Sequence, residues 1–181
     1  MDLAVGLVDT TGFDGLSLAA VAGEAGVAVP SLYKHIGSLA DLRRAVAVVA
    51  LQRLARGSAA ATVGRSGEEA LRALARAIRT FAAEHPGLYA ATQEAPRSDD
   101  AVGAEHAAAA ADAVAIVAAV LSGFGPGGPA AVPAVRTVRS AIHGFVDLEA
   151  RGGFGLPDDL DDSFEVLLDV LTAGLRAVGA S

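Results

Sequence analysis

The segment VAVPSLYKHIG, residues 27–37, holds the only lysine of a 181-residue chain whose net charge is −7. Proline is tolerated in the first turn of a helix, so Pro30 marks the start of a short one. Leu32 and Ile36 are four residues apart, a spacing that puts both on the same helical face. The segment therefore predicts a short helix with an apolar inner side and with three polar residues outside or at its edge, which are Ser31, Tyr33 and Lys34.

A second short helix is expected just upstream of this segment. Ser17 is a favoured N-cap residue, and Gly26 is a favoured stop. Between them the apolar residues that face inward are Leu18, Val21 and Ala22. The turn Gly26-Val27-Ala28 joins the two helices, and we expect Val27 to point inward and lock their crossing. This is the spacing of a helix-turn-helix, although short helical hairpins with a glycine turn are common in other proteins.

The remaining chain also predicts helices, because apolar residues recur at helical spacing and no alternating strand pattern occurs. Gly12 is expected to end the first helix, the capping box Ser38-x-x-Asp41 to open a later one, and the carboxylates of PDDLDD, residues 157–162, to cap the start of the last. With the other Gly and Pro residues, these signals divide the chain into expected helices at about 2–11, 39–60, 67–84, 86–94, 99–122, 131–151 and 159–178. The fold class is all-α. We expect two domains, a three-helix module over residues 1–45 and a larger helical bundle over residues 46–181.

Composition indicates a soluble, cytoplasmic protein, and thirteen arginines against one lysine, with abundant Ala and Gly, are typical of GC-rich coding and thus of a bacterial source. The chain has no cysteine, which fits a reducing compartment and excludes thiolate metal sites. Acidic residues interrupt the first 24 positions, so we expect no signal peptide. The most apolar window, Ala107 to Leu121, is too short to span a bilayer and carries Asp112, so no membrane partner is expected.

The stretch GVAVPSLYKHIGSLADL resembles the second half of the DNA-binding domain of TetR-family transcriptional regulators, in which a glycine-valine turn leads to a leucine-tyrosine-x-histidine core. The upstream stretch GFDGLSLAAVAGEAG is similar to the first half. This resemblance covers about residues 2–45. Farther along, IHGFVDLEARGGFG is similar to a His-Gly signature in one subgroup of the family, with Ile142 in place of a tryptophan.

The resemblance implies a helix that enters the major groove of a palindromic double-stranded operator. It assigns Tyr33 and His35 to backbone phosphates, and it puts Ser31 and Lys34 at or beside the bases. Three positions that read bases in the family are apolar here, where they offer contacts to thymine methyl groups but no paired hydrogen bonds: Ala28, Val29 and Pro30. Ser17, at a helix N-terminus, is expected to hold a phosphate. The alternative is that these are ordinary side chains on a small helical hairpin.

Charge argues against strong DNA affinity. In residues 1–45 three basic residues stand against five acidic ones, for a net charge of −2. Leu39 occupies the position of a phosphate-binding lysine in the family, and no basic arm precedes the first helix. DNA-binding proteins normally gain affinity by neutralising phosphates. We therefore expect either a longer native N-terminus or weak, only slightly salt-dependent binding.

The C-terminal helices predict a homodimer through residues 131–151 and 159–178. The last helix has one apolar stripe of large residues and a second, smaller stripe around its side, formed by Val166, Val170, Ala173, Gly174 and Ala177. A helix that is apolar beyond one face is buried on two sides. A second subunit covers the extra face and creates a four-helix interface, although burial within one subunit is the alternative.

The middle helices are expected to bind a small-molecule effector. The candidate ligand-binding residues are Phe81, Tyr89, Gln93, Ile116, Val120 and His143. Each is also compatible with an ordinary core or surface position, and His143 with Asp147 is too small a set for a metal site.

Enzyme motifs are missing from the sequence, and no cofactor is expected. GFGPGGP lacks the Lys-Ser/Thr of a phosphate-binding loop, and no serine occupies a nucleophile elbow. The sequence thus predicts a ligand-responsive repressor. The alternative is a helical ligand-binding or interaction protein whose helix-turn-helix no longer engages DNA.

Overall fold

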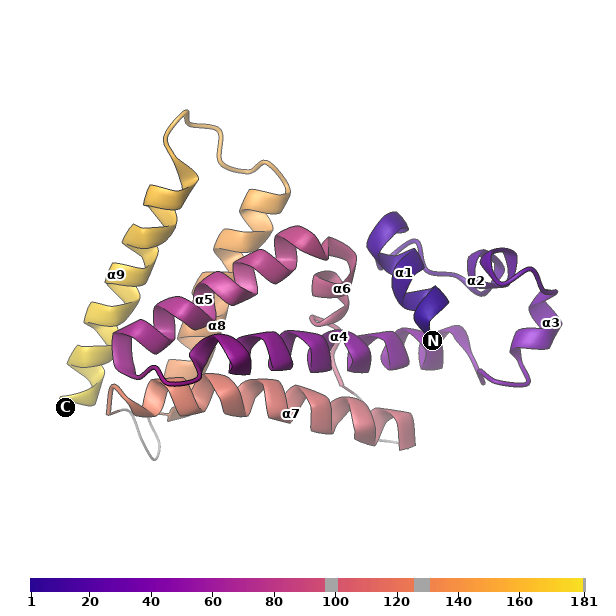
Figure 1. Ribbon diagram of the computed structural model, residues 1–181, viewed down its shortest axis with the longest axis horizontal. Coiled ribbons are helices and arrows are strands. Elements are labelled where there is room, and N and C mark those ends of the chain that lie inside the picture. The colour runs from indigo at the N-terminus through magenta and orange to yellow at the C-terminus, as the bar shows by residue number, and fades with distance from the viewer. Residues whose placement is uncertain (97–100, 126–130, 181) are drawn as a thin grey trace. The chain divides into compact units, whose positions relative to one another are not determined.

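The computed structural model describes residues 1–96, 101–125 and 131–180, and every regular element in these ranges is an α-helix (Figure 1). The helices are α1 (Asp2–Thr11), α2 (Leu18–Glu24), α3 (Val29–Leu32), α4 (Leu39–Thr62), α5 (Gly67–Glu84), α6 (Pro86–Ala91), α7 (Ala101–Ser122), α8 (Ala131–Ala150) and α9 (Leu160–Gly179). The predicted all-α class is confirmed. Residues 99 and 100 of the predicted helix 99–122 lie outside the described residues.

The chain forms two compact units. The first comprises Met1–Leu54 and Glu84–Ala113, and the second comprises Ala55–Ala83 and Val114–Ser181. Helices α4 and α7 each begin in the first unit and end in the second. The boundary expected near residue 45 stays a prediction, because residues 84–113 pack with the N-terminal helices as well.

In the first unit, α1 contacts both α2 and α6. The contact with α6 is unusually close at Gly87, where an added Cβ would overlap the Val8 carbonyl oxygen. Beside it, Asp9 Oδ2 lies 2.8 Å from His85 Nδ1, and Asp9 Oδ1 accepts a hydrogen bond from Leu88 N at 3.4 Å. Only glycine permits this approach of two backbones, so α6 fixes the position of α1.

The turn between α2 and α3 is closed by backbone hydrogen bonds. Val27 N donates to Ala22 O at 3.0 Å and Gly26 N donates to Gly23 O at 3.2 Å, while Gly26 has a φ of 65°. This is a Schellman motif with glycine at the left-handed position. The expected inward direction of Val27 is wrong, because its side chain is 44% exposed. The backbone closes this turn, and the buried residues of α2 are Val21 and Ala22.

Two short helices end earlier than expected. The regular part of α3 ends at Leu32, which is buried, and turns lead to a half-buried Ile36. Helix α6 was expected to reach residue 94 but ends at Ala91. There, the Thr92 hydroxyl donates to Tyr89 O at 2.6 Å. A threonine that bonds to nearby backbone in this way competes with helix continuation.

The second unit packs α8 against α9 and ties α5 to both by ion pairs. Helix α9 begins at Leu160, and its N-cap is Asp159, whose carboxylate accepts a hydrogen bond from Asp161 N, so the acidic cluster there caps the helix as expected. Its inner stripe is formed by Phe164, Leu168, Leu171 and Leu175. Arg79 of α5 bonds to Glu149 of α8 at 2.6 Å and lies 4.8 Å from the Phe164 ring centroid. These contacts hold the three helices together.

Helix α7 covers the described part of the predicted helix 99–122 and extends beyond the apolar window from Ala107 to Leu121. It has 22 residues, and among the described helices it alone is long and apolar enough by composition to cross a membrane. The helix is longer than the apolar window because it continues toward its N-terminus through residues 101–106, AVGAEH, and the expectation of no membrane partner stays a prediction. One side of α7 is nevertheless a core face, with Ala109 buried in the first unit and Val120 and Leu121 buried in the second.

Candidate nucleic-acid interface and effector pocket

The segment after Gly26 presents its polar residues to solvent. Tyr33 is 57% exposed, and Ala28, Pro30, Ser31, Lys34 and His35 are exposed beside it. Val29 is half-buried, and Leu32 is the residue that anchors the segment in the core. Ser17 is half-buried at the start of α2, where its hydroxyl oxygen accepts a hydrogen bond from Ala20 N at 3.1 Å. All eight predicted DNA-binding residues thus lie on α2, α3 or the turns beside them.

The start of α4 offers little positive charge. Ser38 caps the helix by accepting a hydrogen bond from Asp41 N at 3.1 Å, as its sequence pattern predicted. Asp41 in turn pairs with Arg44, whose guanidinium lies 2.5 Å from its carboxylate. Leu39 is exposed at the start of α4, at the position where the family resemblance leads one to expect a phosphate-binding lysine. The Arg44 charge is therefore compensated within the first turns of the same helix.

Arg43 is held by several groups of the first unit. Its guanidinium carbon lies 4.0 Å from the centroid of the Phe13 ring, and its Nη1 donates to Phe13 O at 3.2 Å. Nη2 lies 3.4 Å from Asp14 and 3.8 Å from Glu94. A guanidinium stacked on an aromatic ring and paired with carboxylates is strongly fixed. Arg43 thus joins the loop after α1 to α4 and to the segment after α6.

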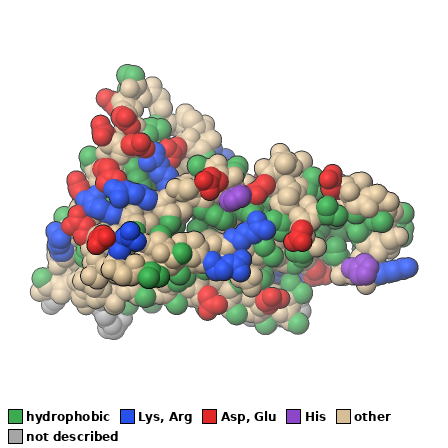
Figure 2. Space-filling view, in the orientation of Figure 1, with side chains coloured by type: hydrophobic (Ala, Val, Ile, Leu, Met, Phe, Trp, Pro, Cys, Tyr) green, Lys and Arg blue, Asp and Glu red, His purple; other side chains and the backbone are tan. Residues whose placement is uncertain are grey.

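Charged side chains are distributed unevenly over the surface. Figure 2 shows basic and acidic side chains interleaved over α5 and α9, whereas basic side chains are few over α2 and α3. The interleaved group centres on Arg72, which pairs with Glu68 at 2.9 Å, with Glu165 at 2.7 Å and with Asp169. Arg72 is thus paired with carboxylates of its own unit, so it adds no net positive charge that would attract the phosphates of DNA.

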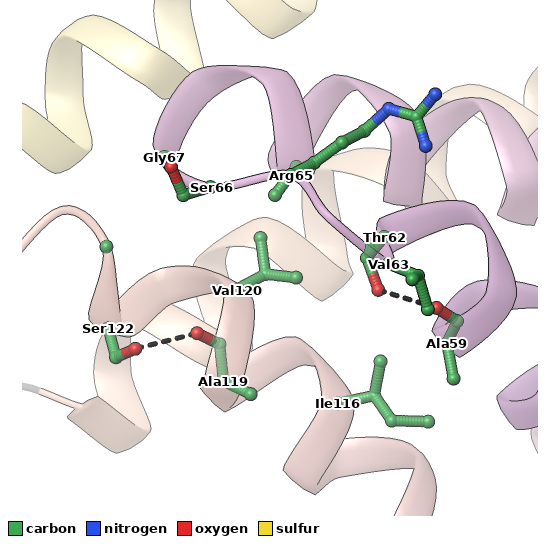
Figure 3. Close-up of a pocket in the computed structure, with 12 residues that line it drawn as sticks. Ala59, Thr62, Val63, Arg65, Ser66, Gly67, Ile116, Ala119, Val120 and Ser122 are labelled. Carbon is green, nitrogen blue, oxygen red and sulfur yellow. Dashed lines mark hydrogen bonds between the residues drawn. The ribbon is translucent and has the colours of Figure 1, made fainter.

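A pocket of about 380 Å³ lies in the second unit, between the end of α4, the start of α5 and the end of α7. In Figure 3, Ile116 and Val120 point from α7 toward the turn that joins α4 to α5. Its polar side chains are occupied locally: the Thr62 hydroxyl donates to Ala59 O at 3.0 Å, and the Ser122 hydroxyl to Ala119 O at 2.7 Å (Figure 3). The pocket therefore offers mainly apolar contacts.

Only two of the six predicted ligand-binding residues line this pocket, Ile116 and Val120. Phe81 and His143 belong to the same unit without lining it, and Tyr89 and Gln93 belong to the first unit. Sequence reasoning missed the other wall, which is built from small residues around the α4–α5 turn, such as Ala59, Thr62 and Gly67. The available signal was the stretch ATVGRSG, in which small residues leave space between three helix ends.

His106 of α7 was also missed. It is fully buried in the first unit, and neither of its ring nitrogens has a hydrogen-bond partner among the described residues. Burial lowers the pKa of His106 below its usual value; the Glu94 carboxylate opposes this shift and Arg44 adds to it. An unpaired buried imidazole is stable only as the neutral form, so His106 is uncharged in the folded protein near neutral pH.

Comparison with known families agrees with this architecture at both ends of the chain. Residues 1–46 match the model of bacterial regulatory proteins of the tetR family, and residues 71–171 match a tetracyclin repressor-like C-terminal domain. The chain belongs to the TetR family of transcriptional regulators. The family resemblance predicted from the sequence is confirmed, whereas the His-Gly subgroup of the family stays a prediction.

The alignments with two relatives cover nearly the whole of this TetR-family chain. The uncharacterized HTH-type transcriptional regulator Rv0681 of Mycobacterium tuberculosis is 39% identical over 175 residues, which are 96% of this chain and 78% of the relative. The HTH-type regulator YobS of Bacillus subtilis is 31% identical over 97% of this chain and 90% of its own. The crystal structure of the regulatory protein SCO4313 superposes with a TM-score of 0.74 at 25% identity, covering 94% of this chain and 91% of that one.

Membership in the TetR family settles the class of protein. TetR-family proteins are soluble DNA-binding regulators of transcription, and repression relieved by a ligand is their general function. They act as dimers and respond to small-molecule effectors. The family is not one of enzymes.

Proposed function

We propose that this TetR-family protein is a cytoplasmic, homodimeric repressor that a small molecule releases from a palindromic operator. The observation that carries the proposal is the outward presentation of Ser31, Tyr33 and Lys34 while Leu32 of the same segment is buried. A segment of this kind offers a hydroxyl, a phenol and an ammonium group to the major groove and its phosphates. It has no catalytic role in this account.

Each exposed residue has a role in the proposed complex. Tyr33 and His35 bind backbone phosphates, and Ser31 and Lys34 lie at or beside the base edges. Ser17 adds a phosphate contact, because its hydroxyl oxygen accepts the Ala20 N–H while its hydrogen is left to donate. Phosphate contacts position a protein on DNA, and base contacts select the sequence.

Exposed apolar residues on α9 support the homodimer. Val170 is 64% exposed, and Val166, Ala173, Gly174 and Ala177 beside it are exposed too. These five residues form the smaller stripe predicted from the sequence, on the side of α9 away from its buried leucines. Val132 and Leu148 of α8 add exposed apolar area. Pairing of α8 and α9 from two subunits covers these faces, and two-fold symmetry then calls for half-sites about 34 Å apart.

The pocket between α4, α5 and α7 is the proposed effector site. Its volume of about 380 Å³ lies within the range of small-molecule sites, and its lining is mainly apolar. We expect a small, largely apolar effector that contacts Ile116 and Val120. Helix α4 starts in the unit with the recognition segment and ends at this pocket, so it is the proposed lever. The effector favours a conformation whose two recognition segments no longer fit the operator.

A mobility shift with the DNA that flanks the gene of this protein tests the proposal. A repressor forms a complex that weakens as salt rises and that disappears when one half of the palindrome is scrambled, because both subunits must bind together. The control is the same duplex with both half-sites scrambled. If the flanking DNA and the scrambled control are bound equally, the operator proposal is wrong.

The charge of the first module favours a second candidate, a TetR-family protein that binds a ligand without engaging DNA. Arg43 and Arg44 are both paired with carboxylates, and the module as a whole is acidic. In that case the flanking DNA forms no complex at any salt concentration, whereas a ligand still raises the melting temperature.

A further inference from the structure

The cations of the DNA-binding module are largely occupied. Residues 1–46 contain Lys34, Arg43 and Arg44 as their only basic side chains apart from histidine. Arg43 is stacked on Phe13 and paired with Asp14 and Glu94, and Arg44 is paired with Asp41. Lys34 is exposed and makes no ion pair with any residue that the structure describes. It is therefore the one lysine or arginine of the module that is at once exposed and unpaired.

The residues that face outward before Lys34 carry no group for paired hydrogen bonds to bases. Recognition of guanine in the major groove relies mostly on arginine or lysine, recognition of adenine on asparagine or glutamine, and recognition of cytosine on a carboxylate. Residues 27–33 contain none of these side chains. Ala28 and Pro30 are instead exposed and apolar, and the Tyr33 ring is exposed beside them.

One feature of base pairs suits an exposed apolar surface, the C5-methyl group of thymine in the major groove. We infer that the recognition segment selects its half-site chiefly through thymine methyl groups, contacted by Ala28 and Pro30, with Lys34 supplying the one charged donor. This inference rests on the proposed repressor function, and it specifies which bases the operator presents to the segment.

The expected size of each contact follows from the area of one methyl group. Removing a methyl that is buried in an apolar contact costs about fourfold in affinity. Because the dimer has two half-sites, removing the matching methyl from both multiplies the loss to about 16-fold. Loss of the N7 acceptor of a guanine has little effect where no side chain donates to it, and at a guanine beside Lys34 the O6 atom still accepts the ammonium hydrogen bond.

The experiment starts from duplexes that the full-length protein selects from a random pool. In a selected duplex, each thymine is replaced in turn by uracil, which removes only the methyl, and each guanine by 7-deazaguanine, which removes only the N7 acceptor. We expect the largest uracil loss, about fourfold per half-site, to exceed the largest 7-deazaguanine loss. A uracil loss equal to or smaller than the 7-deazaguanine loss overturns the inference.

A protein variant identifies the side chain. Pro30→Ala removes two ring carbons from the proposed contact, and we expect the uracil penalty at one position per half-site to vanish in this variant. The matched control is Pro157→Ala, which changes an exposed proline before α9 and keeps the full penalty. An unchanged penalty in Pro30→Ala overturns the assignment to Pro30. If no duplex is enriched from the pool at all, the repressor proposal fails, and this inference fails with it.

Discussion

Gly87 of α6 lies directly against the carbonyl oxygen of Val8 in α1, with no space for a side chain between them. This backbone contact is accompanied by the Asp9–His85 pair at 2.8 Å. It joins the first helix of the DNA-binding module to a helix that lies nearly 80 residues later in the chain. The position of the module therefore depends on α6 as well as on α4.

Gly87→Ala is expected to destabilise the folded protein by about 1–3 kcal/mol, because the new methyl group forces two backbones apart. The measurement is the midpoint of denaturant unfolding. Gly57→Ala in α4 is the matched control, since no atom lies near the added Cβ there and alanine favours a helix interior. Equal midpoints for the two variants would show that α1 and α6 do not pack this closely.

Binding to DNA is expected to depend only weakly on salt. With Arg43 and Arg44 paired internally, the log–log slope of affinity against salt for a dimer should stay below about 5 in magnitude. Fluorescence anisotropy over a salt series measures this slope. A steeper slope would contradict this expectation, because it requires the operator to displace the internal ion pairs of Arg43 and Arg44.

His106 predicts a loss of stability in mild acid. Its pKa is lowered in the folded protein, so the unfolded chain takes up a proton first as the pH falls below the ordinary histidine value of about 6.5. The resulting loss of folding stability is absent above a pH of about 6.5 and grows as the pH falls toward the pKa of His106 in the folded protein. In His106→Leu, the fall in melting temperature between neutral and mildly acidic pH should be smaller. His35→Gln, which changes an exposed histidine, should retain the full fall.

The exposed stripe on α9 predicts a variant that dissociates the dimer. Val170→Glu puts a carboxylate in the centre of the proposed interface, where it loses its water without gaining a partner. Sedimentation velocity should show a monomer for this variant and a dimer for Leu156→Glu, which changes an exposed loop residue. If both variants sediment as dimers, the exposed stripe on α9 is not the dimer interface.

Local sequence signals were sufficient for most helix ends. Ser17, Ser38 and Asp159 cap the helices they were expected to start, and Gly12 and Gly26 end α1 and α2 with positive φ. These signals act within four residues, so they are readable without the fold. Val27 was misread because a turn closed by its own backbone leaves no local sign of which way the side chain points.

Long-range contacts carried no such signal. The Arg43 stack on Phe13 joins residues 30 apart, and the Asp9–His85 pair joins residues 76 apart. Nothing in either short stretch identifies its partner, because each pairing depends on how whole helices pack. For the same reason the sequence showed a net acidic module, but not that two of its three cations are already engaged.

The affinity of the Tyr33→Ala variant for the DNA that flanks its own gene tests the central claim most directly. Tyr33 is exposed, so its removal should abolish operator binding and leave the dimer and the melting temperature nearly unchanged. Unchanged DNA binding, or unfolding of the variant, would contradict the account that the segment after Gly26 is the DNA-binding surface.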